Sequence, residues 1–311
     1  MSNLTLGINV IFPVFFVIFI GYMLKQKGMI DDSFVAMSTK LVFYVALPAK
    51  LFFDIKNSEL DGIDMKYTLY LLSAILITYI LAWSIGSIFI KDKSKLSAFV
   101  HCAYRSNFVY IGLPIIESIF KDPVMDSVIV VMIFGLTLYN ILATIVLTYY
   151  SGEKLRPIDF VIKIIKNPMI IAIFAGVAFR FINIPIYSGL ENGASMLGKL
   201  STPLSLILIG GSLDFSGGTE DIGIVLSCSF IKDALIAMVM IPIGYKLGFS
   251  PSQLVVAFIF FASPCAVNCF IMGKQMGSDP ILTSKIVTMS FAMSIFTYSI
   301  GISLLKSTGI I

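Results

Sequence analysis

Two apolar stretches of this chain contain residues that a simple membrane anchor does not need. The first, Leu96–Phe120, has Arg105, Ser106, Asn107 and Pro114 inside it. A helix that crosses a bilayer takes about 20 apolar residues, so this stretch is long enough to span one. Arginine at the centre of a bilayer costs about 2.5–3.5 kcal/mol on insertion scales, and proline removes a backbone hydrogen bond. Because irregular backbone at that depth survives only against protein or a wet cavity, we interpret the stretch as a broken helix that faces a polar cavity.

The second stretch, Gln253–Met276, has the same character around Ser263, Pro264 and Asn268. The N–H groups freed at a broken half-helix carry positive potential, and arginine offers a planar fork that matches a carboxylate. The two breaks together predict a binding site for a small organic anion. The expected lining residues are Arg105, Ser106, Asn107, Pro114, Ser263, Pro264 and Asn268.

Each of these residues also has a purely structural interpretation. Arg105 would then pair with an acidic residue and hold two helices together, Pro264 would only kink its helix, and Asn268 would form an interhelical hydrogen bond. Polar residues inside a membrane are functional by default, which favours the binding site for Asn107 and for the second break. For Arg105 both interpretations stay open.

Lys232 and Asp233 form the second candidate pair, at the centre of the apolar stretch Thr219–Leu247. Neighbours on a helix point about 100° apart, so the two side chains need not pair with each other. Asp233 is a candidate for coupling transport to a gradient of protons or sodium ions. The alternative for both residues is an internal ion pair between helices.

Other polar residues are weaker candidates. Lys50 with Asp54, and Glu117 with Lys121, are spaced as surface pairs on helices, and Lys50 also has the length to reach a cavity mouth. Asn140 lies in the apolar stretch that follows the first break. We find no phosphate loop, hydrolase triad or zinc motif, so we expect no enzyme activity, no cofactor and no metal.

The four cysteines lie inside apolar segments, at positions 102, 228, 265 and 269. Without a CxxC spacing they are expected to be reduced and packed. Cys265 and Cys269 share a helix face, which we attribute to close packing, since small residues let helices approach. The lone His101 is expected to be packed as well.

The elements that must position these residues are membrane helices. Hydrophobic residues make up 58% of the 311-residue chain and charged residues only 13%, against about 25% in soluble domains. Mean hydropathy is +0.96. We therefore expect an all-α integral membrane protein. Ten spans are predicted: Ile8–Leu24, Ser33–Ile55, Tyr67–Ile90, Leu96–Phe120, Pro123–Tyr150, Phe160–Phe181, Ser188–Leu213, Thr219–Leu247, Gln253–Met276 and Ile281–Leu305.

The two halves of the chain repeat. Pro13 and Gly21 recur 155 positions later as Pro168 and Gly176. Five spans per half is an odd number, so the second half enters the membrane from the opposite side. This predicts an inverted repeat of 5+5 helices, with the fourth and ninth helices broken and crossing near the midplane. The predicted divisions are 1–150 for the first repeat, 151–159 for a cytoplasmic connector and 160–311 for the second repeat.

Lys and Arg are more frequent after odd-numbered spans than after even-numbered ones. By the positive-inside rule, the central connector lies in the cytoplasm and both termini lie outside. We expect a multi-pass protein of the cell membrane.

At the two breaks the chain resembles the auxin efflux carrier family, which includes the plant PIN auxin carriers and bacterial malate and malonate permeases. The similarity rests on Arg105-Ser106-Asn107 through Gly112-Leu113-Pro114, on Ala262-Ser263-Pro264, and on Asp279-Pro280-Ile281-Leu282. The resemblance covers the whole chain. Ser106 stands where plant members have proline, and the central connector is short, so auxin itself is in doubt as the substrate.

The resemblance implies a scaffold of helices 1, 2, 6 and 7 and a mobile domain of helices 3–5 and 8–10. It also implies elevator-type alternating access in a homodimer, with the family's crossover asparagine at Asn107 and its crossover proline at Pro264. The expected function is a secondary active permease of a small organic anion, a carboxylate. The expected partners are this anion, protons or sodium, and the bilayer, without nucleic acid.

Two other functions were weighed. A membrane-embedded ligand sensor without transport is the alternative, and the absence of any soluble output domain in the sequence disfavours it. An intramembrane enzyme lacks a nucleophile with its base, or a metal cluster.

Overall fold

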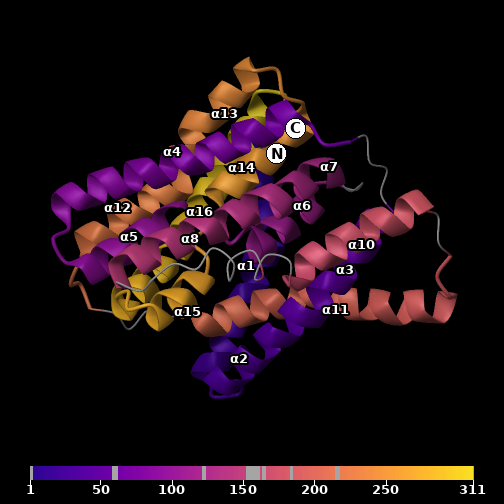
Figure 1. Ribbon diagram of the computed structural model, residues 1–311, viewed down its shortest axis with the longest axis horizontal. Coiled ribbons are helices and arrows are strands. Elements are labelled where there is room, and N and C mark those ends of the chain that lie inside the picture. The colour runs from indigo at the N-terminus through magenta and orange to yellow at the C-terminus, as the bar shows by residue number, and fades with distance from the viewer. Residues whose placement is uncertain are drawn as a thin grey trace.

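The computed structural model describes residues 3–57, 62–120, 124–151, 162, 166–182, 185–213 and 218–310, apart from the side chains of residues 3–10, 271 and 275. Every regular element within these residues is a helix (Figure 1). This confirms the all-α prediction for the described part of the chain.

The first half contains α1 (Asn3–Gln26), α2 (Asp32–Leu41), α3 (Leu47–Asn57), α4 (Met65–Phe89), α5 (Lys93–Tyr104), α6 (Leu113–Ile119), α7 (Met125–Val130) and α8 (Leu136–Ser151). The second half contains α10 (Pro168–Ile182), α11 (Ser188–Ser212), α12 (Ile222–Phe230), α13 (Ile236–Lys246), α14 (Pro251–Ala262), α15 (Asn268–Gln275) and α16 (Pro280–Ser307). Short π-helical turns join several pieces: η1 (Val42–Ala46), η2 (Phe108–Gly112), η3 (Val131–Gly135) and η4 (Ile231–Leu235).

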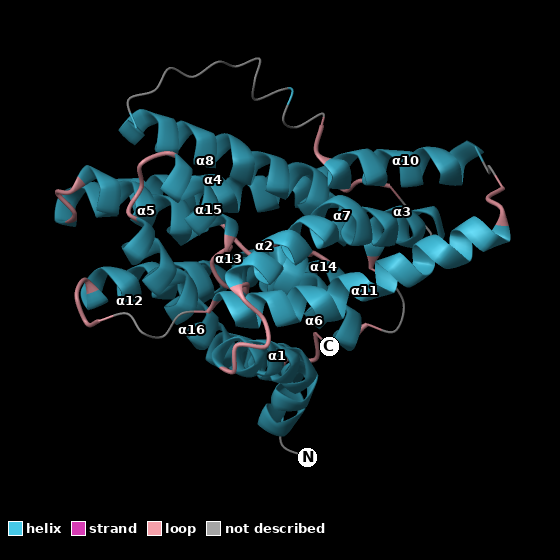
Figure 2. Cartoon of the chain, turned by 90° about the horizontal axis from the view of Figure 1, so that it is seen from below, coloured by secondary structure: helices cyan, strands magenta, loops and turns pink. Residues whose placement is uncertain are grey.

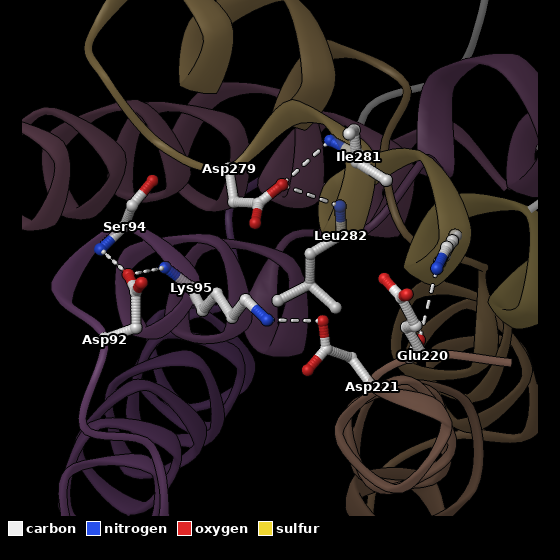
Figure 3. A network of polar contacts seen from close by, with 9 residues as sticks. Asp92, Ser94, Lys95, Glu220, Asp221, Asp279, Ile281 and Leu282 are labelled. Carbon is white, nitrogen blue, oxygen red and sulfur yellow. Dashed lines mark hydrogen bonds and ion pairs between the residues drawn. The ribbon is translucent and has the colours of Figure 1, made fainter. Parts of the chain in front are cut away.

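Aspartates start several of the helices. Asp92 accepts hydrogen bonds from the backbone N–H groups of Ser94 and Lys95, and Asp279 accepts them from Ile281 and Leu282 (Figure 3). A carboxylate at this position satisfies N–H groups that have no acceptor within the helix. The same residues place a charged group at each helix end, where a spanning helix leaves the membrane.

Six helical segments in the described residues are long and apolar enough to cross a membrane: Asp32–Asn57, Met65–Phe89, Met125–Ser151, Ser188–Ser212, Ile222–Lys246 and Pro280–Ser307. Four further apolar helices are shorter: Ile11–Gln26, Phe108–Ile119, Pro168–Ile182 and Pro251–Ala262. Two of these shorter helices, Phe108–Ile119 and Pro251–Ala262, are halves of the broken stretches, and each is too short to be identified as a membrane span by its length. The ten-helix inverted repeat stays a prediction.

Large apolar side chains cover the outside of the helices. In α4, Leu69, Ile80 and Phe89 are 60%, 58% and 77% exposed. Single exposed leucines are normal in soluble proteins, but apolar residues that line whole outward faces indicate lipid. These outward faces agree with a multi-pass membrane protein.

Two prolines follow π-helical turns. Pro48 lies two residues after η1, and Pro114 lies two residues after η2. Proline has no N–H to donate to the preceding turn, and a wide turn before it accommodates the missing bond. Pro114 is therefore part of a continuous helical segment, Phe108–Ile119, and the break lies before it.

The helices pack in two groups. α1, α2, α3, α10 and α11 contact one another, chiefly α1 with α11 and α3 with α10. α4 to α8 and α12 to α16 form the second group, in which α5 packs on α4 and α8 and α16 packs on α12 and α15. Figures 1 and 2 both show α3, α10 and α11 on one side of the molecule and α4, α5, α8 and α12 on the other. The groups meet where α1 contacts α6 and α16, and where α11 contacts η2.

Two close approaches within the first group are related by the 155-residue interval. A side chain at Gly21 of α1 would collide with the backbone oxygen of Ile207 in α11. A side chain at Gly176 of α10 would lie 2.9 Å from the backbone oxygen of Phe52 in α3. Gly176 follows Gly21 by the same interval by which Ile207 follows Phe52. The contact of α1 with α11 therefore has a counterpart in the contact of α10 with α3.

Candidate functional site

The two predicted breaks meet backbone to backbone. α5 ends at Tyr104, and α14 ends at Ala262. Between them the Asn107 N–H donates to the Pro264 oxygen at 2.8 Å, and the Ala266 N–H donates to the Arg105 oxygen at 3.1 Å. These bonds flank an isolated antiparallel bridge between residues 106 and 265. Each extended segment thus supplies the hydrogen-bond partners that the other lost when its helix ended.

Hydroxyl groups fix the two extended segments to nearby helix ends. Ser106 Oγ donates to the Phe260 oxygen at 2.8 Å. Ser263 Oγ donates to the Ile259 oxygen at 2.6 Å and accepts from the Tyr298 hydroxyl at 2.7 Å. Ser106 and Ser263 are buried, so the structure gives them positioning contacts at the crossing.

Arg105 contacts a residue that sequence analysis ranked lower. Its Nη2 donates to Oδ1 of Asn140, in α8, at 2.8 Å. Its Nη1 is buried and has no hydrogen-bond partner within the described residues. The guanidinium also forms no ion pair with an acidic residue in this part of the chain, and the side chain is only 7% exposed. A buried guanidinium with an unsatisfied donor is the kind of group that a carboxylate would complete.

The two site asparagines lie at the starts of the helices that leave the crossing. Asn107 precedes η2, and Asn268 is the first residue of α15. Neither side-chain amide forms a hydrogen bond within the residues that the structure describes. Asn107 is 5% exposed and Asn268 is half-buried. The N–H groups of Cys269 and Phe270, in the first turn of α15, already donate to the oxygens of Ala266 and Val267. The start of each helix still carries the positive end of its dipole.

Lys232 and Asp233 lie in η4 and are both completely buried. Lys232 Nζ donates to the Phe261 oxygen at 2.7 Å. Asp233 Oδ1 accepts from Ser290 Oγ at 2.7 Å, and Ser290 Oγ in turn accepts from the Cys265 N–H at 2.7 Å. Asp233 Oδ2 has no hydrogen-bond partner in the described structure. Both charged residues are therefore connected to the second break, through separate contacts.

Ser290 and Tyr298 were missed by the sequence analysis. Together with Ser294 they recur every fourth residue on α16, and all three are fully buried. A polar stripe at helical spacing inside an apolar helix is the signal that could have found them.

Two other candidates lie away from the crossing strands. Pro114 is buried in α6. Lys50, in α3, forms ion pairs with Asp54 at 3.1 Å and with Glu117, in α6, at 2.8 Å. The Lys50–Glu117 pair joins the two packing groups, and it was not predicted because Glu117 was assigned to Lys121, which lies outside the described residues.

A cavity of about 310 Å³ lies elsewhere, between the beginnings of α4 and α14. Its lining includes Asp64, Asp126 and Gln253. Gln253 precedes the second break by ten residues, which is about 15 Å of helix. The two carboxyl groups make this cavity unsuitable for an anion.

The sequence profile of a family described as membrane transport protein matches residues 6–302. A protein of Rhizobium meliloti (strain 1021) named "Putative malonate transporter" is 20% identical over 96% of this chain and 96% of its own length. A protein of Methanothermobacter thermautotrophicus (strain Delta H) named "Uncharacterized transporter" is 23% identical over 92% of this chain and 94% of its own length. These matches extend over both helix breaks.

Proposed function

The chain belongs to the membrane transport protein family, in agreement with its resemblance to the auxin efflux carriers, and we propose that it is a secondary transporter of a small organic anion. The observation that carries the proposal is the buried Arg105, at the point where two helix breaks cross. Its Nη1 has no hydrogen-bond partner in the described part of the chain. The sequence has no phosphate loop, so concentrative transport would use an ion or substrate gradient.

The substrate is a carboxylate held by donors from both breaks. Arg105 would supply the charge, and the amides of Asn107 and Asn268 would supply hydrogen bonds. The first N–H groups of Phe108–Ile119 and of α15 add positive potential. Ser106, Ser263 and Pro264 shape the crossing through their backbone and hydroxyl contacts, and Pro114 lies in the helix that follows.

A dicarboxylate suits this arrangement best. One carboxylate would complete the Arg105 fork, and the second would face donors of the other break. The name of the Rhizobium relative refers to malonate, a small dicarboxylate, which is consistent with this class.

Alternating access would proceed by movement of one packing group along the other. α1, α2, α3, α10 and α11 would form the scaffold, and the second group would carry the crossing. The paired approaches of Gly21 to Ile207 and of Gly176 to Phe52 support an inverted repeat with divisions 1–150, 151–159 and 160–311. The proposal includes a homodimer in the cell membrane with both termini outside.

Asp233 is the proposed coupling group. Its Oδ2 has no hydrogen-bond partner among the residues that the structure describes, while its Oδ1 is linked through Ser290 to the backbone of the second break. Uptake of a proton or a sodium ion by this carboxylate would change the contacts that hold the crossing. Lys232, bonded to Phe261, would keep the helix before the break in place.

The test is transport by proteoliposomes that contain the purified protein. Malonate, malate, acetate and indole-3-acetate would each be offered with a proton or sodium gradient. Wild type is expected to take up a carboxylate, and Asn107→Ala is expected to lose uptake while keeping its expression and size-exclusion profile. Asn192→Ala, an exposed asparagine of α11, is the matched control and should transport normally. Normal uptake by Asn107→Ala would contradict the proposed site.

A further inference from the structure

Three of the four cysteines gather beside the crossing. Cys102 comes from α5, Cys265 from the second break and Cys269 from the first turn of α15. Their Sγ atoms all lie within 4.8 Å of one another. Each residue is 0% or 1% exposed, and none forms a disulfide. In the sequence only Cys265 and Cys269 share a helix face, and Cys102 is brought to them by the fold.

The spacing of the sulfurs is close to that of a three-coordinate metal site. Metal–thiolate bonds of about 2.3 Å in a trigonal arrangement place sulfurs about 4 Å apart. Rotamer adjustments of less than about an ångström would bring the three thiols to that distance.

The present contacts of these thiols are weak. Cys269 Sγ donates to the His101 oxygen at 3.7 Å, and Cys265 Sγ donates to the Ala266 oxygen at 3.9 Å. A thiol is a weak hydrogen-bond donor, so the protein would lose little stabilising free energy if an ion displaced these protons.

We propose that Cys102, Cys265 and Cys269 form a trigonal thiolate site for a soft monovalent cation such as Cu(I) or Ag(I). Soft thiolate ligands select soft ions, whereas structural zinc takes four ligands. The group of metal-ligating atoms found in the described residues consists of the three sulfurs. The buried His101, whose ring lies beside Cys269, is outside this group. We therefore expect this site to bind Cu(I) more tightly than Zn²⁺.

The charge of such a site has a partner nearby. Each sulfur that bonds the ion releases its proton to solvent, so no oxidant or reductant is needed. Three thiolates around a monovalent ion leave two net negative charges, which are costly in a buried place. The buried Lys232, whose Nζ donates to the Phe261 oxygen just before the second break, would offset part of this charge.

An ion at this site would tie α5, which leads into the first break, to the second break and α15. It would hold the two crossing segments together without contacting Arg105 or Asn140. The inference does not depend on transport, because its readout is ion binding.

The experiment is a titration of the full-length purified protein with Cu(I) in competition with a chromogenic Cu(I) chelator. One ion per chain is expected in wild type. Cys102→Ser, Cys265→Ser and Cys269→Ser should each weaken binding at least tenfold. Cys228→Ser is the matched control, because this buried cysteine lies outside the group and its thiol donates to the Phe99 oxygen. It should bind as wild type does.

X-ray absorption at the copper edge of the loaded wild type keeps the test independent of how the variants fold. Three sulfur neighbours at about 2.3 Å would support the site. Two sulfurs, or mainly nitrogen and oxygen neighbours, would overturn it. Absence of binding would also overturn it. Equal binding by all four serine variants would overturn it too, because the ligands would then be other groups such as methionine sulfurs.

Discussion

The two helix breaks meet at one place but are built differently. Among the described residues, the first carries Arg105, with a buried donor that has no hydrogen-bond partner, and Asn107, whose amide forms no hydrogen bond. The extended part of the second carries no charged side chain, and its groups are bonded to the frame through Ser290 and Tyr298. The open charged donor therefore lies in the first break, whereas the second break contributes the open amide of Asn268 at the start of α15 and is otherwise bonded to α16. We infer that the first break supplies most of the binding groups and the second supplies rigidity.

The largest effect is expected from removing the charge of the first break. Arg105→Gln keeps a side-chain N–H donor but loses the charge and is two bonds shorter. A hydrogen bond to a charged group contributes about 1.5–3 kcal/mol, so uptake of the carboxylate at low concentration should fall at least tenfold. Initial rates in proteoliposomes measure this, and Arg180→Gln in α10 serves as the control. Equal losses of uptake in both variants would show that the effect of Arg105→Gln is not specific to the crossing.

A smaller effect is expected from loosening the second break. Ser290→Ala removes both the acceptor of the Cys265 N–H and the donor to Asp233. Two hydrogen bonds at a net 0.5–1.5 kcal/mol each give a loss of about 1–3 kcal/mol in unfolding free energy. Ser299→Ala, whose hydroxyl bonds only to the Ile295 oxygen of its own helix, should cost less.

Thermal unfolding of the detergent-purified variants measures this loss. If Ser290→Ala were as stable as wild type, the second break would not depend on this contact, and the contrast between the breaks would fail. Because Ser290 positions the second break and is not a proposed substrate ligand, uptake should fall less in the folded Ser290→Ala variant than in Arg105→Gln.

The smallest effect is expected from the ion pair between the packing groups. Glu117→Gln weakens the contact of α6 with Lys50 of α3, which a sliding movement would have to break. Partly exposed ion pairs contribute about 0.2–1 kcal/mol, so the transport rate should change about two- to threefold. Asp221→Asn breaks the Lys95–Asp221 pair, which lies within one group at 2.6 Å (Figure 3), and should leave the rate unchanged. Equal effects of the two changes would argue against movement between the groups.

Much of the crossing could be predicted from local sequence. Apolar stretches of spanning length interrupted by Arg105-Ser106-Asn107 and by Ser263-Pro264 marked both breaks to within a few residues. Pro114 lies in the helix that resumes after the first break, because the π-helical turn η2 accommodates its missing N–H, and its role in the site stays a prediction. Sequence identifies a residue that disfavours a helix, and the three-dimensional context decides whether the helix ends there.

Tertiary partners could not be predicted in the same way. Asn140 as the partner of Arg105, Ser290 as the partner of Asp233, and Cys102 as the neighbour of Cys265 all bring together residues far apart in the chain. Local periodicity carries no information on which helix faces which. The 155-residue interval does carry some, since it relates the contact of Gly21 with Ile207 to that of Gly176 with Phe52.

The most direct test of the central claim, that the crossing binds a carboxylate, is thermal stabilisation of the purified protein by a panel of mono- and dicarboxylates, indoles and neutral solutes. A ligand that binds only the folded state raises its stability, by about 2.7 kcal/mol at a hundred times its Kd. The account predicts that one carboxylate class stabilises wild type and not Asn107→Ala. Stabilisation by no carboxylate, or equal stabilisation of both proteins, would contradict it.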